Sequence, residues 1–166
     1  ESVNGKGIYI VNENEELNIK NNISANTGGG YAIWVEDPSD ISMSDFNGFY
    51  STGTNLAHWG GTDYLFLSAF SGISGMDKHS LETEPIFYSD NGLYSTQALF
   101  HKAATPVSEV EYDIDGIARD ASTPDIGASE FSCVEPTFNV YVSPACFGDT
   151  TMIIDSTENI APGSSR

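Results

Sequence analysis

Basic residues are scarce in this chain. Its 166 residues include 6 Lys and Arg against 24 Asp and Glu, which gives a formal net charge of −18. A negative field of this size repels phosphate backbones and anionic lipid headgroups, so the composition argues against nucleic acid and membrane surfaces as partners. No apolar run approaches the ~18 residues of a membrane span, so we do not expect membrane insertion. Cations and neutral ligands remain as possible partners.

Cysteine is nearly absent. Cys133 and Cys146 form a disulfide in an oxidising compartment or remain free thiols in a reducing one, and their spacing leaves both alternatives open. Two cysteines and three scattered histidines, His58, His79 and His101, do not make a zinc site, because no pair has ligand spacing. Each histidine is therefore expected to lie at the surface or in a hydrogen bond.

Signals for targeting are also missing. The chain begins at Glu1 without Met, a basic segment or an apolar segment, so we expect it to begin inside a longer protein. Its residues are rich in Ser, Thr, Asn, Asp and Gly and poor in Lys, a composition that favours a secreted or cell-surface protein. The 39% of apolar residues is enough to bury a core.

A repeated pattern stands out among the residues that are present. The segment 7–12 (GIYIVN) is echoed by 31–36 (YAIWVE), and 18–22 (NIKNN) is echoed by 42–47 (SMSDFN). Two strand-like segments thus recur in the same order after about 24 residues. Such an interval is typical of a solenoid, in which each coil repeats the inward and outward positions of the one before.

Short strands separated by turn residues are predicted for the first fifty positions. We expect them at 7–11, 17–23, 32–35 and 41–50. Alternation in the second and fourth predicts that Leu17, Ile19, Ile41 and Met43 are buried. The polar residues between them are expected to face outward: Asn18, Lys20, Asn22, Ser42 and Ser44.

The rest of the chain is less regular. Residues 65–70 (LFLSAF) indicate a helical turn packed against the strands, and 86–88, 93–94 and 124–131 indicate further strands. The character of the sequence changes near residue 132, after which 138–142 and 150–156 read as strands of another β domain. We therefore predict two parts, 1–131 and 132–166.

Aromatic residues offer one kind of binding site. Tyr9, Trp34 and Trp59 could stack on sugar rings if they share an exposed face. Trp34 is flanked by Ile33 and Val35, so alternation places it on the outer wall if those two point inward. Core packing is the alternative, and it is favoured for Phe46 and Phe49.

Carboxylates offer another kind of site. Asp113 and Asp115 lie in a short acidic run that could supply oxygen ligands to calcium, although its glycine is in the wrong register for an EF-hand. The favoured interpretation is that both cap turns and that Arg119 pairs with one of them. No other cofactor is indicated.

Catalysis receives little support from the sequence. A polyuronate lyase needs a base and cationic groups beside the substrate carboxylate, whereas the six basic residues are spread singly along an acidic chain. Carboxylates are so numerous that a glycosidase pair cannot be recognised. We therefore assign no catalytic residue.

Several segments together resemble a known family. They are 21–26 (NNISAN), 31–34 (YAIW), 42–47 (SMSDFN), 75–80 (GMDKHS), 113–119 (DIDGIAR) and 124–131 (PDIGASEF). This set resembles the last coils of secreted bacterial right-handed parallel β-helix repeat proteins of the pectate-lyase-like type. Residues 97–104 (QALFHKAA) depart from the pattern of that family. The segment 146–151 (CFGDTT), with 155–156 and 161–164, resembles the first strands of a PKD-type immunoglobulin-like domain.

The resemblance implies an all-β fold: the end of a right-handed parallel β-helix followed by a partial β-sandwich. It implies a non-catalytic module of a large multidomain protein, carbohydrate-contacting, adhesive or structural, with a polysaccharide or surface glycan as partner. The alternative is part of a polysaccharide lyase or glycosidase whose active site lies mainly elsewhere. Fold alone does not choose between them.

Overall fold

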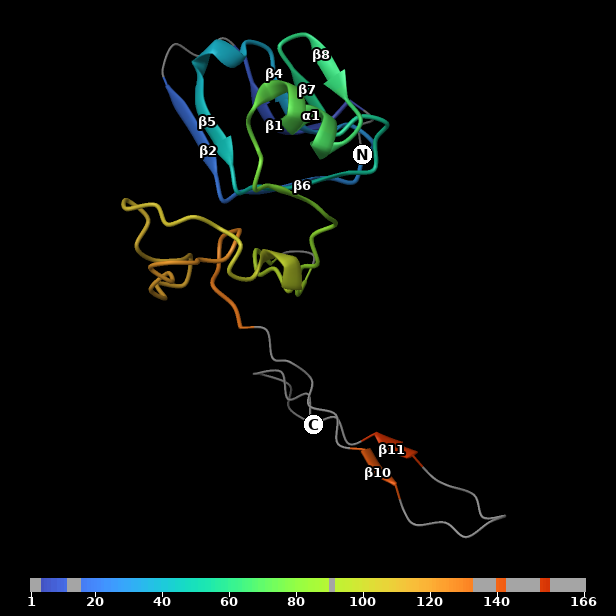
Figure 1. Ribbon diagram of the computed structural model, residues 1–166, viewed down its shortest axis with the longest axis vertical. Helices are drawn as coiled ribbons and strands as arrows, with labels where there is room; N and C mark the ends of the chain where they lie inside the picture. Colours follow the sequence, from blue (N-terminus) through green and yellow to red (C-terminus); the bar gives the residue numbers. More distant parts are fainter. Residues whose placement is uncertain (1–3, 12–15, 90–91, 133–139, 143–152, 156–166) are drawn as a thin grey trace, which may run out of the picture. The chain divides into compact units, whose positions relative to one another are not determined.

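The computed structural model describes residues 4–11, 16–89, 92–132, 140–142 and 153–155. The chain divides into two compact units, residues 1–132 and 133–166, and each is described by itself. The first unit is mostly β-sheet with one α-helix (Figure 1).

Parallel pairing dominates the first unit. One sheet has the order β1-β4-β7-β8, a second pairs β2 with β5, and a third has the order β3-β6-β9. All contacts between these strands are parallel except that of β7 with β8. The bounds are β1 Lys6–Ile10, β2 Leu17–Lys20, β3 Ile23–Asn26, β4 Tyr31–Val35, β5 Ile41–Asp45, β6 Gly48–Ser51, β7 Ala57–Trp59, β8 Thr62–Tyr64 and β9 Leu81–Glu82.

The register of β1 on β4 differs by one residue from the sequence echo. Ile8 pairs with Ile33 and Tyr9 with Trp34, so partners are 25 residues apart. Aligning Gly7 with Tyr31, as the sequence echo does, is therefore wrong by one residue. The interval shortens to 24 between β4 and β7, where Ile33 pairs with Ala57.

The strand predicted at 17–23 ends early, at Lys20, with a further strand from Ile23 to Asn26, and the strand predicted at 41–50 is broken into two. Asn21 separates β2 from β3 with φ 60°, and Phe46 separates β5 from β6 with φ 58°. A left-handed backbone conformation turns the chain sharply. It is uncommon in residues other than glycine and rarer still in a bulky aromatic residue. At each of these corners the chain passes from the second sheet to the third.

The expected alternation fails in β5. A register shift places Asn18 opposite Met43 and Ile19 opposite Ser44. Ser44 is consequently buried, whereas the sequence predicts that it faces outward. A one-residue shift exchanges the two faces of a strand, which explains the error.

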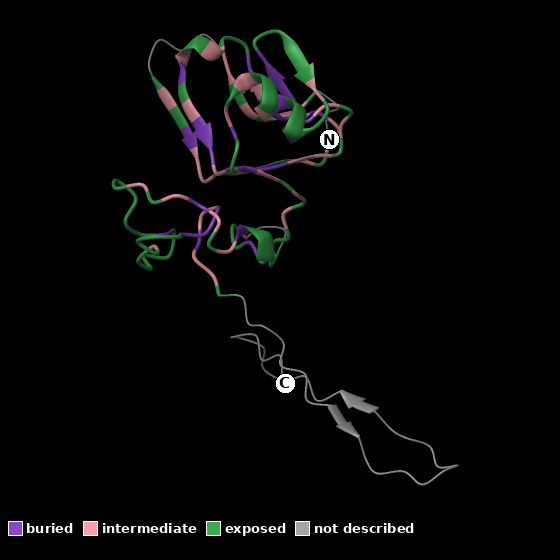
Figure 2. Cartoon of the chain, in the orientation of Figure 1, coloured by how far each residue is buried: buried purple, intermediate pink, exposed green. Residues whose placement is uncertain are grey.

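All three sheets contribute to one core. Its buried residues include Ile19 of β2, Ile33 and Val35 of β4 and Phe49 of β6. Figure 2 shows buried stretches on the strands of the first unit. The prediction that Phe49 is a core residue is confirmed, since its side chain is fully buried. Phe46 is half-buried and stacks on His79 with ring centroids 4.8 Å apart.

A hairpin and a helix close the core beside β7. The turn at Gly60 and Gly61 joins β7 to antiparallel β8, a pair that the sequence patterns do not reveal. Helix α1, Leu67–Ser74, buries Leu67 and Phe70 in the core. The predicted helical turn is thus confirmed but displaced toward the C-terminus.

The closing segment 98–131 covers the outer face of the third sheet instead of adding strands. Its only regular features among the described residues are the short helical turn η2, Ala98–Phe100, and an isolated antiparallel bridge between Tyr112 and Ala118. The strand predicted at 124–131 is absent, and those predicted at 86–88 and 93–94 are reduced to an isolated antiparallel bridge between Phe87 and Ser95. Phe100, Ala104 and Ile126 form a second apolar cluster with Ile23 of β3 and Leu81 of β9. Side chains thus hold this segment to the sheet.

The second unit is described only in two strands. β10, Val140–Val142, and β11, Ile153–Asp155, pair antiparallel and lie inside the predicted strands 138–142 and 150–156. Cys133 and Cys146 lie outside the described residues, so their pairing stays a prediction.

Candidate functional site

A row of side chains crosses the outer face of the first sheet. Register aligns Tyr9 of β1 with Trp34 of β4, and Trp34 with His58 of β7. Trp34 and His58 stack with ring centroids 3.7 Å apart and 10° between their planes. Because Ile33 and Val35 are fully buried, Trp34 faces outward as the alternation predicts. Tyr9 is 56% exposed.

Polar contacts fix the orientation of this row. Asp63 of β8 lies opposite His58, and its Oδ1 lies 2.6 Å from the Nδ1 of His58. The Tyr31 hydroxyl donates to the other carboxylate oxygen of Asp63 at 3.1 Å. Tyr31 also meets the edge of Trp34, with centroids 4.7 Å apart. The rings are therefore held in place before any ligand arrives.

The two faces of the Trp34 indole are already in contact with protein groups. Lys6 Nζ lies 4.6 Å from the centroid of Trp34 and 4.6 Å from that of Tyr9. Because the strand order is β1-β4-β7, Lys6 approaches Trp34 from the side opposite His58. A sugar could stack on Trp34 only after Lys6 moves away.

Trp59, the third aromatic residue predicted to contact sugar, lies elsewhere. Its side chain belongs to the core, where its ring centroid is 5.0 Å from that of Phe70. Trp59 is next to His58 on β7, so alternation turns it to the opposite face. The structure thus corrects the sequence analysis: Trp59 is a packing residue.

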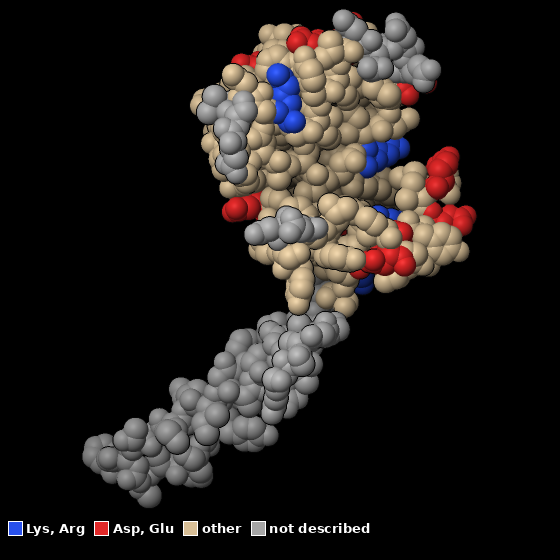
Figure 3. Space-filling model, turned by 180° about the vertical axis from the view of Figure 1, so that it is seen from behind, with Lys and Arg blue, Asp and Glu red and all other residues tan. Residues whose placement is uncertain are grey.

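A hollow of about 1050 Å³ lies between β2 and the segment 105–121. Figure 3 shows a notch in the surface with basic side chains on its walls and acidic ones along its rim. The size suits a ligand of several sugar units. Its lining includes Asn18, Lys20, Asn22, Glu109, Glu111, Arg119 and Asp120.

Each wall of this hollow presents polar groups. The β2 wall carries amides and one ammonium, from Asn18, Asn22 and Lys20. On the opposite wall, the Ser108 hydroxyl lowers the pKa of Glu109, and the backbone N–H groups of Thr123 and Ser122 lower the pKa of Asp120. Those carboxylates are ionised at neutral pH and accept hydrogen bonds. The hollow therefore offers both donors and acceptors to a hydroxyl-rich ligand.

Backbone contacts account for Asp113, one of the two calcium candidates. Its Oδ1 accepts from the backbone N–H groups of Asp115 and Ile117, at 2.9 and 2.8 Å, and its Oδ2 accepts from that of Glu130. Asp113 therefore caps a turn, as the favoured interpretation predicts. Asp115 instead accepts from the Tyr94 hydroxyl at 2.9 Å. Among the described residues, no group of three or more His, Cys, Asp or Glu could hold a metal ion.

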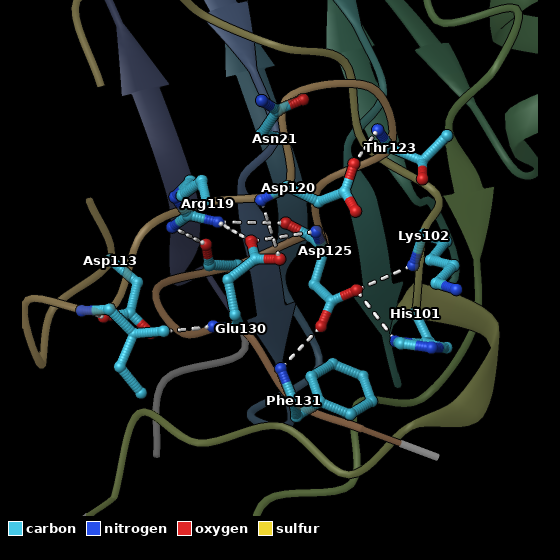
Figure 4. Close-up of polar contacts among 12 residues, drawn as sticks. Asn21, His101, Lys102, Asp113, Arg119, Asp120, Thr123, Asp125, Glu130 and Phe131 are labelled. Carbon is cyan, nitrogen blue, oxygen red and sulfur yellow. Dashed lines mark hydrogen bonds and ion pairs between the residues drawn. The ribbon is translucent and has the colours of Figure 1, made fainter. Parts of the chain in front are cut away.

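Arg119 connects distant parts of the closing segment through hydrogen bonds, as Figure 4 shows. Its Nη1 donates to Glu130 Oε1 at 2.9 Å and to the Asp125 carbonyl, and its Nη2 donates to the Gly127 carbonyl at 2.7 Å. The prediction that Arg119 pairs with Asp113 or Asp115 is wrong. Its carboxylate partner lies eleven positions later in the chain, where no local spacing rule applies.

Asp125 forms the other centre of this network. Its Oδ1 lies 3.0 Å from His101 Nδ1 and accepts from the Lys102 backbone N–H at 2.7 Å. Its Oδ2 accepts from the Phe131 backbone N–H. The segment 124–131 therefore has a structural role: it is held to Arg119 and to residues 101–102, and its Pro124 and Gly127 line the hollow on the side away from β2.

All three histidines are hydrogen-bonded, as the sequence analysis predicts. Each Nδ1 contacts an aspartate: His58 with Asp63, His79 with Asp45 and His101 with Asp125. The pairs lie apart in the sequence, so only the fold reveals this regularity.

The hollow is the feature that sequence reasoning missed. Lys20 and Arg119 are 99 positions apart, yet both line it, together with Glu109, Glu111 and Asp120. The link between the walls is Asn21, which donates through Nδ2 to the Thr105 carbonyl and accepts through Oδ1 from the Thr105 N–H. No pattern within either segment signals that contact.

Comparison of the chain with models of known protein families, with curated proteins and with solved structures finds no match in any of the three. Within the described residues, no helix has the length and apolarity to cross a membrane. The site must therefore be interpreted from its own geometry and charges.

Proposed function

We propose that this chain is a non-catalytic, carbohydrate-contacting module of a secreted or cell-surface protein, and that β1–β9 belong to coils of a right-handed parallel β-helix. The parallel pairing of β1 with β4, β2 with β5 and β3 with β6, at intervals of 24 or 25 residues, supports the coil interpretation. One core shared by the three sheets supports it too.

The hollow beside β2 is the observation that carries the proposed function. It combines amides, an ammonium and ionised carboxylates around about 1050 Å³. Neutral sugar hydroxyls both donate and accept, so they can satisfy such a mixed lining without introducing charge. An anionic polymer would have to approach a chain of net charge −18, which disfavours it. We therefore expect a neutral polysaccharide.

The test is retention on immobilised or gel-embedded neutral polysaccharides, with oligosaccharide titration for those that retain the protein. Asn18→Ala and Glu111→Ala remove exposed polar groups from opposite walls of the hollow. Each should weaken binding by about fivefold or more, because one hydrogen bond contributes about 1 kcal/mol. Ser42→Ala, an exposed serine of β5 outside the lining, is the matched control.

Absence of retention on every polysaccharide, or retention unchanged by both variants, would contradict the proposal. The aromatic row makes a separate contribution testable. If Tyr9 and Trp34 also contact the glycan, Tyr9→Leu should weaken retention in addition to the effect of Asn18→Ala.

An enzymatic role is the second candidate, favoured by the meeting of Lys20 with three carboxylates in one hollow. Release of reducing ends or of unsaturated uronate from the same polysaccharides would support a glycosidase or a lyase. The Arg119 guanidinium is committed to Glu130 and two carbonyls, so it is not free to neutralise a substrate carboxylate. We therefore place the binding function first.

The remaining parts of the proposal concern the rest of the polypeptide. We propose that residues 132–166 begin a PKD-type spacer domain and that further domains of the same polypeptide are partners of this module. Calcium is kept as a candidate ligand only at Asp115, since the carboxylate oxygens of Asp113 accept from three backbone N–H groups.

A further inference from the structure

Lys6 is held by aromatic rings in a chain where carboxylates are abundant. Its Nζ lies 4.6 Å from the ring centroids of both Tyr9 and Trp34. No ion pair joins Lys6 to a carboxylate within the described part of the chain, although the sequence has 24 Asp and Glu. Ring faces attract a cation through their negative quadrupole. The outer face of the first sheet is therefore built to hold an ammonium group.

The rings that hold this ammonium are fixed in advance. Trp34 is stacked on His58, meets Tyr31 edge-on and donates its Nε1–H to Glu36 Oε1 at 3.1 Å. His58 is in turn held by Asp63. A preorganised site loses little freedom when a ligand arrives, so its attraction for a cation is available for binding.

The surroundings favour positive charge. Glu36 is exposed beside Trp34, and the Asp63 side chain is 44% exposed beside His58. The net charge of −18 raises the local concentration of cations near any part of the surface. Lys6 is the cation that the structure places on the ring faces, and it is tethered there by a flexible side chain.

We propose that Tyr9 and Trp34 form a binding site for a quaternary ammonium group, and that Lys6 is its tethered, displaceable occupant. A trimethylammonium group carries the same charge as Lys6 but is more weakly hydrated. Its methyl groups can contact both rings, as in aromatic cages that recognise choline or methylated lysine. The Lys6 side chain can swing into solvent when such a ligand binds. This site shares no residue with the hollow beside β2, so it does not rest on the proposal that the hollow binds a polysaccharide.

The test is a titration of the 15N-labelled protein with choline chloride, followed through the indole Nε1–H resonance of Trp34. Sodium chloride at the same ionic strength is the reference. We expect a saturable shift in the millimolar range for the wild-type protein. Lys6→Ala should bind choline several-fold more tightly, about fivefold if Lys6 occupies the rings four-fifths of the time.

Two further variants separate the site from its surroundings. Tyr9→Leu, at an exposed position of an edge strand, should weaken choline binding by at least about fivefold, since it removes one of the two ring faces. Lys78→Ala removes a cation at an exposed position outside the row and should bind like wild type. A Lys78→Ala effect equal to that of Lys6→Ala would assign the gain to net charge and overturn the role of Lys6.

Loss of the site has a clear signature. No saturable shift with choline in either wild type or Lys6→Ala, or a shift that Tyr9→Leu leaves unchanged, would overturn the proposal. Vesicles of phosphatidylcholine distinguish the sources of the group. If the protein binds choline but not the vesicles, the natural ligand is a free molecule or a soluble polymer. If the protein co-sediments with the vesicles and choline inhibits this co-sedimentation, the ligand is a headgroup displayed at a surface.

Discussion

The ring of Phe100 fills the space above Gly48 in which any other residue would carry its Cβ. A Cβ at Gly48 would lie 2.6 Å from Phe100 Cζ, well inside contact distance. Gly48 pairs with Ile23 on one side and with Leu81 on the other, so the missing side chain leaves a slot between two apolar ones. The closing segment is attached to the third sheet through this slot.

Phe100→Ala should therefore destabilise the first unit. The ring is fully buried, and truncating a buried phenylalanine typically costs about 3–5 kcal/mol. The measurement is urea unfolding followed by fluorescence. Leu99→Ala, at a neighbour that is 58% exposed, is the control and should change stability by less than about 0.5 kcal/mol. If Phe100→Ala lowered the free energy of unfolding by less than about 1 kcal/mol, the proposed attachment of the closing segment through this slot would be contradicted.

Substitution of Asn47 should also destabilise the first unit, in this case through the loss of buried hydrogen bonds. Its fully buried amide donates to the Ile19 carbonyl and to Asp77 Oδ1, and it accepts from the Asn22 N–H. Asn47→Leu keeps a similar branched shape but removes these hydrogen bonds and leaves the Ile19 carbonyl and the Asn22 N–H without this partner, so it should cost about 3 kcal/mol or more.

Hydrogen exchange at the Asn22 amide would report the Asn47→Leu effect locally and should accelerate. An exchange rate equal to that of the wild-type protein, at matched global stability, would show that Asn47 does not link the corner at Asn21 to the corner at Phe46.

Arg119→Lys should loosen the closing segment although it conserves the charge. One ammonium cannot reproduce the planar fork that reaches Glu130 and two carbonyls at once. We expect a loss of about 2–4 kcal/mol in thermal or urea unfolding, because Glu130 is left only partly paired. Lys102→Arg, at an exposed position of the same segment, is the control for exchanging the two cationic side chains. If Arg119→Lys unfolds like wild type, the network does not stabilise the segment.

Asp77 should make the protein less stable as the pH rises. Burial raises the pKa of this carboxyl above 3.8, and the charge of Asp45 adds to the effect, although hydrogen bonds from Ser44, Ser80 and Asn47 oppose it. The folded state therefore binds the proton more tightly than the unfolded state. The stabilisation is complete below pH 3.8 and is lost as the pH rises through the folded-state pKa.

Asp77→Asn should consequently be more stable than wild type at neutral pH, and its advantage should shrink toward acid. Denaturant midpoints across the pH range test this. If the stability difference between Asp77→Asn and wild type did not change with pH, its cause would be something other than ionisation of Asp77.

Asp113 should behave in the opposite way. Burial raises its pKa, but three backbone N–H bonds, from Glu130, Ile117 and Asp115, together with the Arg119 charge, lower it to a net value below 3.8. Its contribution to stability is therefore present above pH 3.8 and lost as the pH falls through the folded-state pKa. Asp113→Asn should reduce stability at neutral pH and flatten the acid limb of the unfolding profile. An unchanged acid limb would contradict this.

The sequence predicts local features of the fold well. Strands with regular alternation, such as that around Ile33 and Val35, lie where expected, and the fully buried Phe49 was recognised as a core residue. The corners at Asn21 and Phe46 were missed because left-handed backbone at a non-glycine residue leaves no compositional signal. Ser44 was misplaced because a register shift is a property of two strands together.

The candidate sites were predictable only in part. Trp34 and Tyr9 were found because their alternation is local, but Lys6 over their rings was not. The hollow was invisible because it depends on Asn21 meeting Thr105, 84 positions away. Neither segment contains a motif that requires the other. Contacts of that separation are decided by how the closing segment packs on Gly48.

The strand order has a consequence for how this structure can be extended. β1 and β3 are the edge strands of their sheets at the same end, whereas antiparallel β8 lies at the edge of the first sheet at the other end, next to α1. Edge strands with free backbone groups can accept another strand, and a parallel partner on β1 would continue the existing ladder. The molecule is thus directional: strand addition in register is favoured at the β1 and β3 end and terminated at the β8 end.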